Sequence, residues 1–191
     1  MKKLSLILSI ILILFLFSFS VYSQDLSDPD GYGGSYVRGN AKVVDGDTIV
    51  IKNLRIRLFG IDAPEKNQIC KINSKAYNCG HTSTEALKIL INGHRVLCQW
   101  KNLDVYGRPL AICRAPGRME GSTIVLNAMM VITGNAVAYK KYSKKYLDSE
   151  NSAKESRIGI WQGEFDMPWD WRRKYKWFII IKWFEKQIFI Y

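Results

Sequence analysis

The chain has 191 residues and carries 28 Lys and Arg against 17 Asp and Glu, a formal net charge of +11. This length suits one domain with a substantial core, and the lack of internal repeats excludes an array of small units. The basic surface favours a polyanionic partner, which leaves nucleic acid and anionic lipid both open.

The first 23 residues are typical of a cleaved export signal. Met1-Lys2-Lys3 is basic, Leu4 to Val21 is almost entirely apolar, and small residues end the run near Ser23. An uncleaved membrane anchor is the alternative, because the apolar run approaches the length of a bilayer span. Without this segment, 26 basic and 17 acidic residues leave a net charge of +9. The Gly-, Asp- and Ser-rich residues 24–40 then predict a flexible leader.

The next residues predict strands. Lys42 to Ile51 indicates two strands joined by a turn at Asp45-Gly46. Leu54 to Ile61 alternates, which indicates a half-buried strand that presents arginines on one face and aliphatic side chains on the other. These side chains are Arg55 and Arg57 against Ile56 and Leu58.

A short helix is expected from Thr82 to Ile91, with capping-box spacing at its start and Asn92-Gly93 at its end. Two further strands flank the turn at Asp104 to Arg108, and helices are expected over 122–133 and 143–157. Five short strands with an inserted helix predict an α+β, mainly β domain. The architecture expected is a five-stranded OB-fold barrel with about three flanking helices.

Four cysteines in an exported chain favour two disulfides. Cys98 and Cys113 lie in the two strands that flank one turn, and Cys70 and Cys79 flank a polar loop, so these pairs are the natural ones. Closing the loop between Cys98 and Cys113 would contribute about 3 kcal/mol in the chain-entropy model. Zinc is the alternative, although the sequence has no close Cys-x-x-Cys spacing or histidine cluster to support it.

The C-terminal part of the chain divides in two. Trp161, Trp169 and Trp171 suggest an aromatic clasp across the barrel, which ends the domain (residues 41–173) near Arg173. Residues 174–191 form an apolar and basic extension that is too short to span a membrane as a helix. It either makes weak contact with a membrane surface or has no selected function.

Acidic and basic side chains are concentrated between Asp45 and Glu65. Asp47 and Asp62 can converge at one barrel edge and hold a hard cation through carboxylate oxygens. Arg57 and Arg108 offer planar donor forks for a phosphate, and Glu65 could take a proton from water. Each feature has an ordinary alternative, since Asp-Gly pairs make hairpin turns and surface arginines make weak ion pairs.

Three motifs together resemble the staphylococcal-type thermonuclease family. They are Asp45-Gly46-Asp47-Thr48, the run from Arg57 to Glu65, and Asp104-Val105-Tyr106-Gly107-Arg108. The similarity continues to about Trp171, and the four cysteines and the Trp161 to Phe165 ending resemble the exported bacterial branch.

The resemblance implies a calcium ion held by Asp47, Asp62 and the main-chain oxygen of Ala63. It implies that Arg57, Glu65 and Arg108 are catalytic, and that a second set contacts the nucleic acid substrate. That set is Tyr106, Lys140 and Tyr142. In the family, water attacks phosphorus in DNA or RNA and the 5′-oxygen leaves, which gives 3′-phosphate ends.

The family pattern is not matched at every position. Ala63 stands where the family has a threonine, and Val105 stands where its best-known member has a lysine. Lys140 stands where a tyrosine of that enzyme would fall. A carbonyl ligand survives the change at Ala63.

The sequence therefore predicts an exported hydrolase, a calcium-dependent endonuclease located in the periplasm or outside the cell. We expect a monomer with no stable protein partner. The first competitor is a catalytically inactive OB-fold protein that binds nucleic acid. The second is a membrane-associated structural protein, which would leave the residues between Asp45 and Arg108 unexplained.

Overall fold

The computed structural model describes residues 34–177. The expected export signal, most of the leader and nearly all of the C-terminal extension lie outside the described residues. Among the helices of residues 34–177, none is long and apolar enough to cross a membrane.

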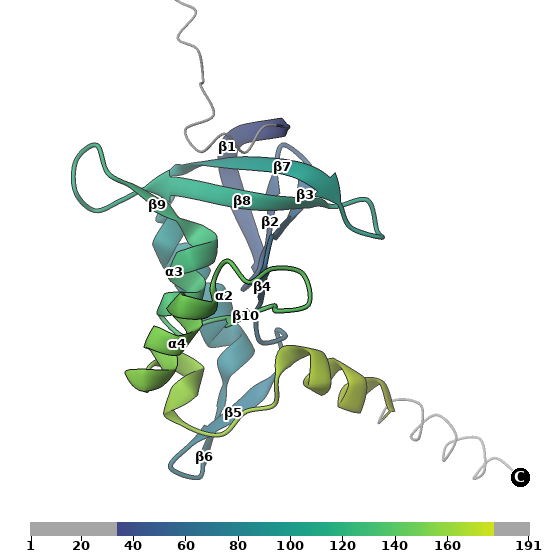
Figure 1. Ribbon diagram of the computed structural model, residues 1–191, viewed down its shortest axis with the longest axis vertical. Coiled ribbons are helices and arrows are strands. Elements are labelled where there is room, and N and C mark those ends of the chain that lie inside the picture. The colour runs from purple at the N-terminus through teal and green to yellow at the C-terminus, as the bar shows by residue number, and fades with distance from the viewer. Residues whose placement is uncertain (1–33, 178–191) are drawn as a thin grey trace, which may run out of the picture. The chain divides into compact units, whose positions relative to one another are not determined.

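The central feature is a closed β-barrel (Figure 1). Five strands run in the order β3-β2-β1-β7-β8, and β3 also pairs with β8 in parallel through Arg57↔Leu110 and Leu58↔Ala111, which closes the ring. The five strands are β1 (Ser35–Asp45), β2 (Thr48–Ile51), β3 (Leu54–Leu58), β7 (Arg95–Leu103) and β8 (Pro109–Pro116). The expected α+β, mainly β, OB-type barrel is confirmed.

The barrel interior follows the alternation that the sequence shows. Ile56 and Leu58 of β3 are completely buried, whereas Arg55 is exposed and Arg57 is half-buried on the other face. Aliphatic side chains from β2, β7 and β8 fill the same core, as period-two burial requires of strands with one face inward. The arginines of β3 are therefore left outside the core, where they can meet anions.

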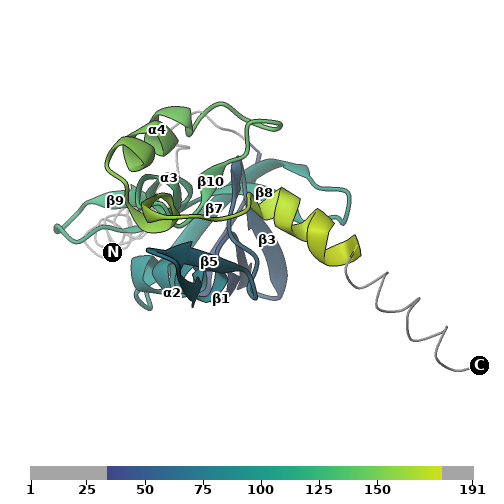
Figure 2. The same ribbon diagram turned by 90° about the horizontal axis from the view of Figure 1, so that it is seen from below.

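Three helices lie below the barrel in Figure 1, and a further helical segment near the C-terminus projects away from them (Figures 1 and 2). The three are α2 (Cys79–Ile91), α3 (Leu126–Ile132) and α4 (Leu147–Glu155), and α3 contacts both α2 and α4. The short η1 (Gly159–Gln162) precedes the further segment, the helical residues 168–177. The remaining strands are short: β4 (Ile61–Asp62), β5 (Ile69–Ile72), β6 (Lys75–Asn78), β9 (Thr123–Val125) and β10 (Val137–Ala138).

Several predicted boundaries were wrong. β1 begins at Ser35, so residues 35–40 belong to the barrel, where they pair with β7, and not to the flexible leader. Helix α2 begins at Cys79 and not at Thr82, because the Asn78 side chain accepts a hydrogen bond from the His81 amide and caps the helix. The helices expected from Ser122 and Ser143 begin later, at Leu126 and Leu147.

The polar loop expected between Cys70 and Cys79 is a hairpin. β5 and β6 pair there, and the turn residues Asn73 and Ser74 both have positive φ (49° and 63°), as a type I′ turn requires. The predicted disulfides are confirmed as Cys70–Cys79 and Cys98–Cys113, and all four cysteines are paired.

Asn127 ties the barrel closure to helix α3. Its side-chain amide is fully buried, donates to the carbonyls of Phe59 and Ala111 (3.0 Å each) and accepts from the amide of Cys113 (3.0 Å). These groups belong to the end of β3 and to β8, the two strands whose parallel pairing closes the ring. Asn127 therefore pairs the Phe59 carbonyl and the Cys113 amide at the seam and adds a second donor to the Ala111 carbonyl, which already accepts from the Phe59 amide (2.8 Å).

We predict that Asn127→Ala lowers the free energy of unfolding by about 2–4 kcal/mol, because the buried Phe59 carbonyl and Cys113 amide lose their partner and the Ala111 carbonyl loses one of its two donors. Urea unfolding followed by circular dichroism measures the change. Asn151→Ala is the matched control: Asn151 is also helical but exposed, and its loss is expected to cost less than about 0.5 kcal/mol. Equal effects of the two substitutions would contradict the role of Asn127 at the seam.

Candidate active site

Asp47 is held at the turn between β1 and β2. Its amide donates a hydrogen bond to Asp45 Oδ1 (3.1 Å), and its carbonyl accepts one from the Leu58 amide (2.8 Å). Since Thr48 pairs with Arg57 across β2 and β3, the register itself brings Asp47 to the end of the arginine-bearing strand. The side chain is 4% exposed.

Asp62 reaches the same edge by a different route. Gly60 turns the chain between β3 and β4 with φ +77°, a conformation that L side chains rarely adopt. β4 then pairs with β10 through Val137↔Asp62, which fixes the backbone of Asp62. The carboxylate is fully buried.

Arg57 joins these two carboxylates. Its guanidinium donates from Nη1 to Asp47 Oδ1 (2.9 Å) and from Nη2 to Asp62 Oδ1 (2.6 Å). The two buried carboxylates thus share one guanidinium group, so Asp47 and Asp62 lie at the same edge of the barrel, as the sequence predicted. Asp47 is held further by the Thr48 hydroxyl (2.9 Å) and the Ala63 amide (3.1 Å).

Burial dominates the electrostatics of this cluster. Burial raises the pKa of Asp45 to about 6, and the negative charge of Asp47 adds to the rise. Burial likewise raises the pKa of Asp62, although hydrogen bonding to Arg172 and the charges of Arg172 and Arg57 oppose it. Burial works to lower the pKa of Arg57, but Asp47 and Asp62 outweigh it and the net shift is upward. Arg57 therefore stays charged.

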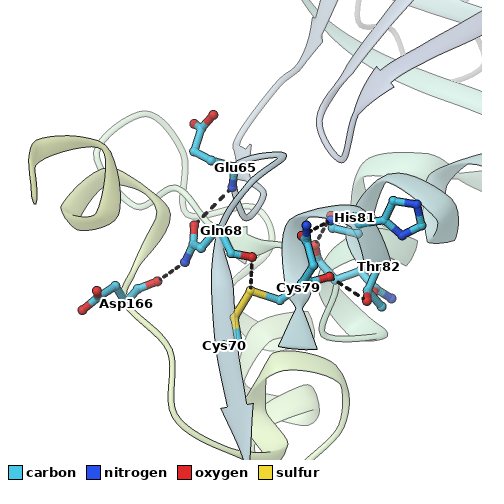
Figure 3. Close-up of a disulfide and its surroundings, with 10 residues drawn as sticks. Glu65, Gln68, Cys70, Cys79, His81, Thr82 and Asp166 are labelled. Atoms are coloured by element: carbon cyan, nitrogen blue, oxygen red, sulfur yellow. Dashed lines mark hydrogen bonds between the residues drawn. A yellow bond between two sulfur atoms is a disulfide. The ribbon is translucent and has the colours of Figure 1, made fainter. Parts of the chain in front are cut away.

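Glu65 projects from a loop that is braced from below (Figure 3). The fully buried side chain of Gln68 accepts from the Glu65 amide (3.1 Å) and donates to the Asp166 carbonyl (2.6 Å). The Cys70–Cys79 disulfide lies beside it, with the Cys79 sulfur 3.3 Å from the Gln68 carbonyl oxygen. A Cβ at Gly80 would lie 1.7 Å from the Glu65 carbonyl oxygen, so only glycine allows this close approach.

Arg108 is positioned by Asp104 and not by the carboxylates of the cluster. Asp104 Oδ2 accepts from Nε (2.7 Å) and Nη2 (2.6 Å) of Arg108, while its Oδ1 accepts from the backbone amides of Tyr106 and Arg108 (2.9 Å each). These hydrogen bonds lower the pKa of Asp104 against the opposing effect of burial. The Asp104 to Arg108 motif is thus a loop that fixes one guanidinium.

One cleft of about 660 Å³ brings most of the predicted site residues together. Arg57, Arg108, Glu65, Asp47 and Ala63 line it, with Tyr106 and Tyr142 as exposed aromatic side chains (81% and 57% exposed). The predicted metal ligand Asp62 is fully buried and does not line the cleft itself. Lys140 is not among the lining residues. Its ammonium group lies 3.4 Å from the buried carboxylate of Glu150, and its neighbour Tyr139 lines the cleft instead.

Arg172 is a cleft residue that the sequence did not reveal. It lies in the helical residues 168–177, and its guanidinium contacts Asp62 and Glu65. Both of these contacts span more than 100 residues of sequence, and the segment Asp170 to Lys174 reads as an ordinary charged stretch. The predicted Trp-rich clasp did point to a docked C-terminal segment: Trp169 stacks on Tyr139 at 5.5 Å between ring centroids.

The donor set fits a hard divalent cation. Two buried carboxylates and the Ala63 backbone offer oxygen ligands, which calcium and magnesium prefer. Within residues 34–177, no group of three or more His, Cys, Asp or Glu is spaced to hold a metal, so water would have to complete the coordination sphere. Zinc, which favours Cys and His, does not fit, because the four cysteines are in disulfides.

We predict that Gln68→Ala lowers the free energy of unfolding by about 2 kcal/mol, because the Glu65 amide and the Asp166 carbonyl lose a buried partner. The same substitution should speed proteolysis after Asp166, since one attachment of that segment is gone. Gln162→Ala is the matched control, as Gln162 is exposed and bonds only locally. Unchanged stability and proteolysis in Gln68→Ala would contradict the bracing role.

Comparisons with known proteins agree with this geometry. The model of the "Staphylococcal nuclease homologue" family matches residues 55–163, more than half of the chain. An "Uncharacterized endonuclease" of Escherichia coli O157:H7 is 34% identical over 170 residues, which cover 85% of this chain and 95% of that protein. A "Micrococcal nuclease" of Shigella flexneri is 33% identical over 147 residues (71% and 79%).

A third relative has a name of a different kind. The "Succinoglycan biosynthesis protein ExoI" of Rhizobium meliloti is 35% identical over 148 residues, which cover 76% of this chain and 75% of that protein. Nucleases of the matched family are generally metal-dependent, in keeping with the oxygen donors of the cleft. The chain belongs to the staphylococcal nuclease family and is a nuclease, a hydrolase whose substrate is nucleic acid.

Proposed function

We propose that this nuclease is an exported, calcium-dependent endonuclease that cleaves DNA and RNA and leaves 3′-phosphate ends. One observation carries the proposal: Arg57 bridges two buried carboxylates, Asp47 and Asp62, and Arg57 and Asp47 line a cleft together with Glu65 and Arg108. A cation site and two phosphate-binding forks in one cleft are what phosphodiester hydrolysis requires.

Asp47, Asp62 and the carbonyl of Ala63 would hold the calcium ion. Calcium tolerates a mixed set of carboxylate, carbonyl and water oxygens better than magnesium, which demands a near-ideal octahedron. When bound, the cation supplies positive charge that stabilises the negative charge growing on the phosphoryl oxygens.

The side chains of the cleft divide the remaining work. Glu65, whose side chain is 36% exposed, accepts a proton from a water molecule while the oxygen of that water attacks phosphorus. The bond from phosphorus to the 5′-oxygen breaks, that oxygen takes a proton from solvent as it leaves, and the phosphate stays on the 3′ side. Arg57 and Arg108 bind the phosphoryl oxygens and bind them more tightly as their charge grows, which stabilises the transition state over the ground state.

Exposed aromatic side chains offer contacts for the bases. Tyr106 and Tyr142 line the cleft, and aromatic rings stack on any nucleobase without reading its sequence. We assign them to substrate binding. Lys140 would act at most on a distant phosphate, because it lies beside Glu150 and outside the cleft lining.

Export is supported by two features of the chain. Residues 1–23 have the pattern of a signal peptide, and the four cysteines form two disulfides. Disulfides of this kind persist in the periplasm and outside the cell.

We predict that the full-length protein cleaves plasmid DNA and RNA when calcium is present and not when a chelator is added. Arg57→Ala, Glu65→Ala and Arg108→Ala should each lower the cleavage rate by about 10²-fold or more, since each removes a group that acts in the transition state. Sensitivity of the product ends to a phosphatase specific for 3′-phosphates tests the direction of cleavage.

Arg118→Ala is a suitable control, because Arg118 lies in the turn that joins β8 and β9 and does not line the cleft. It should leave the rate unchanged. Salt-sensitive binding of nucleic acid by a folded wild type that cleaves nothing would replace the proposal with the inactive OB-fold binding protein.

A further inference from the structure

Arg172 places a positive charge where a metal ion would be expected. Its Nη2 donates to Asp62 Oδ2 (2.7 Å), and its Nη1 donates to Asp62 Oδ1 (3.1 Å) and to Glu65 Oε1 (2.6 Å). One guanidinium thus joins a carboxylate assigned to the metal with the carboxylate assigned to the attacking water.

The oxygens of Asp62 are already occupied by cations. Oδ1 accepts from both Arg57 and Arg172, and Oδ2 accepts from Arg172, while the whole carboxylate is buried. A divalent cation bound to Oδ2 would lie beside the guanidinium of Arg172 with little water between them, and like charges in such surroundings repel strongly. One of the two cations must withdraw.

Arg172 is the group that can withdraw. Arg57 belongs to barrel strand β3, and its side chain is 18% exposed; the side chain of Arg172 is 37% exposed and belongs to the last helical segment described. That segment is anchored before Arg172: Glu164 pairs with Lys71, Asp166 accepts from Gln68, and Trp169 stacks on Tyr139. Arg172 can leave by a side-chain rotation that keeps these anchors.

The charge balance permits an exchange. Asp47, Asp62 and Glu65 carry three negative charges, and the two arginines that contact them carry two positive ones. A divalent cation in place of Arg172 balances these three charges together with Arg57, so the carboxylates stay paired when Arg172 leaves.

We propose that Arg172 is a built-in cation that competes with the metal ion for Asp62 and holds Glu65 until the metal binds. The proposal rests on the metal site assigned above to Asp47 and Asp62. Arg172 then sets the metal concentration at which the site fills, and its departure frees Glu65 to take a proton from water. The metal-free site stays closed by an ion pair within the chain.

Calcium binding to the full-length protein tests this directly. Isothermal titration with calcium chloride should give about tenfold tighter binding, or more, for Arg172→Gln than for wild type, because the competing charge is gone. Arg172→Lys keeps a positive charge and should lie closer to wild type. Arg173→Gln is the matched control: it removes the same charge one residue away, where Arg173 is exposed and pairs with Asp170.

The outcomes separate this inference from the metal site on which it rests. Unchanged or weaker calcium binding by Arg172→Gln, with binding lost in Asp62→Asn, overturns the competition and leaves the metal site standing. Calcium binding that survives in Asp62→Asn overturns both. Equal tightening in Arg172→Gln and Arg173→Gln also overturns the inference, because it would reflect net charge alone.

Chemical modification of the wild-type protein gives a second test, which does not depend on whether a variant folds. Phenylglyoxal modifies accessible arginines, and peptide mass spectrometry resolves each site. Calcium should speed the modification of Arg172, whereas Arg173 should react at the same rate with or without calcium. A rate for Arg172 that calcium leaves unchanged or lowers would overturn the exchange.

Discussion

The arginine bridge between two buried carboxylates is the interaction on which the rest of the site depends. Asp47 and Asp62 are almost without solvent, and unpaired charges in such a place would cost several kcal/mol each. Arg57 pairs with both, and it can do so because the β2–β3 register places Thr48 opposite Arg57 and the Gly60 turn returns the chain to the same edge. Barrel closure and the geometry of the site therefore depend on the same strand end, since the end of β3 takes part in both.

The site is assembled from two parts of the fold. The barrel contributes Asp47, Arg57 and Asp62 from paired strands, while Arg172 comes from a peripheral helical segment. Gln68 and the Cys70–Cys79 disulfide connect these parts beneath Glu65. Such a division allows a rigid phosphate-binding frame and a cation that can leave without disturbing the core.

The sequence predicted the barrel and most of the site because both are encoded locally. Alternation in Leu54–Leu58 marks the half-buried strand, and short motifs place Asp47, Asp62 and Glu65 within ten residues of Arg57. The sequence predicted wrong starting residues for elements whose ends are set by tertiary contacts or by a helix cap. β1 extends to Ser35 because β7 offers a partner, and α2 begins at Cys79 because Asn78 caps it. Arg172 was missed for the same reason, because no local sequence pattern predicts its ion pair with Asp62, which lies 110 positions away.

A crystal structure of the full chain soaked in manganese, with anomalous data, would test the central claim most directly. The account predicts one anomalous peak bounded by Asp47, Asp62 and the Ala63 carbonyl, with Arg57 in place and Arg172 no longer on Asp62. A peak elsewhere in the cleft would contradict the metal assignment. A peak at the expected place with Arg172 still bound to both oxygens of Asp62 would contradict the exchange of one cation for the other.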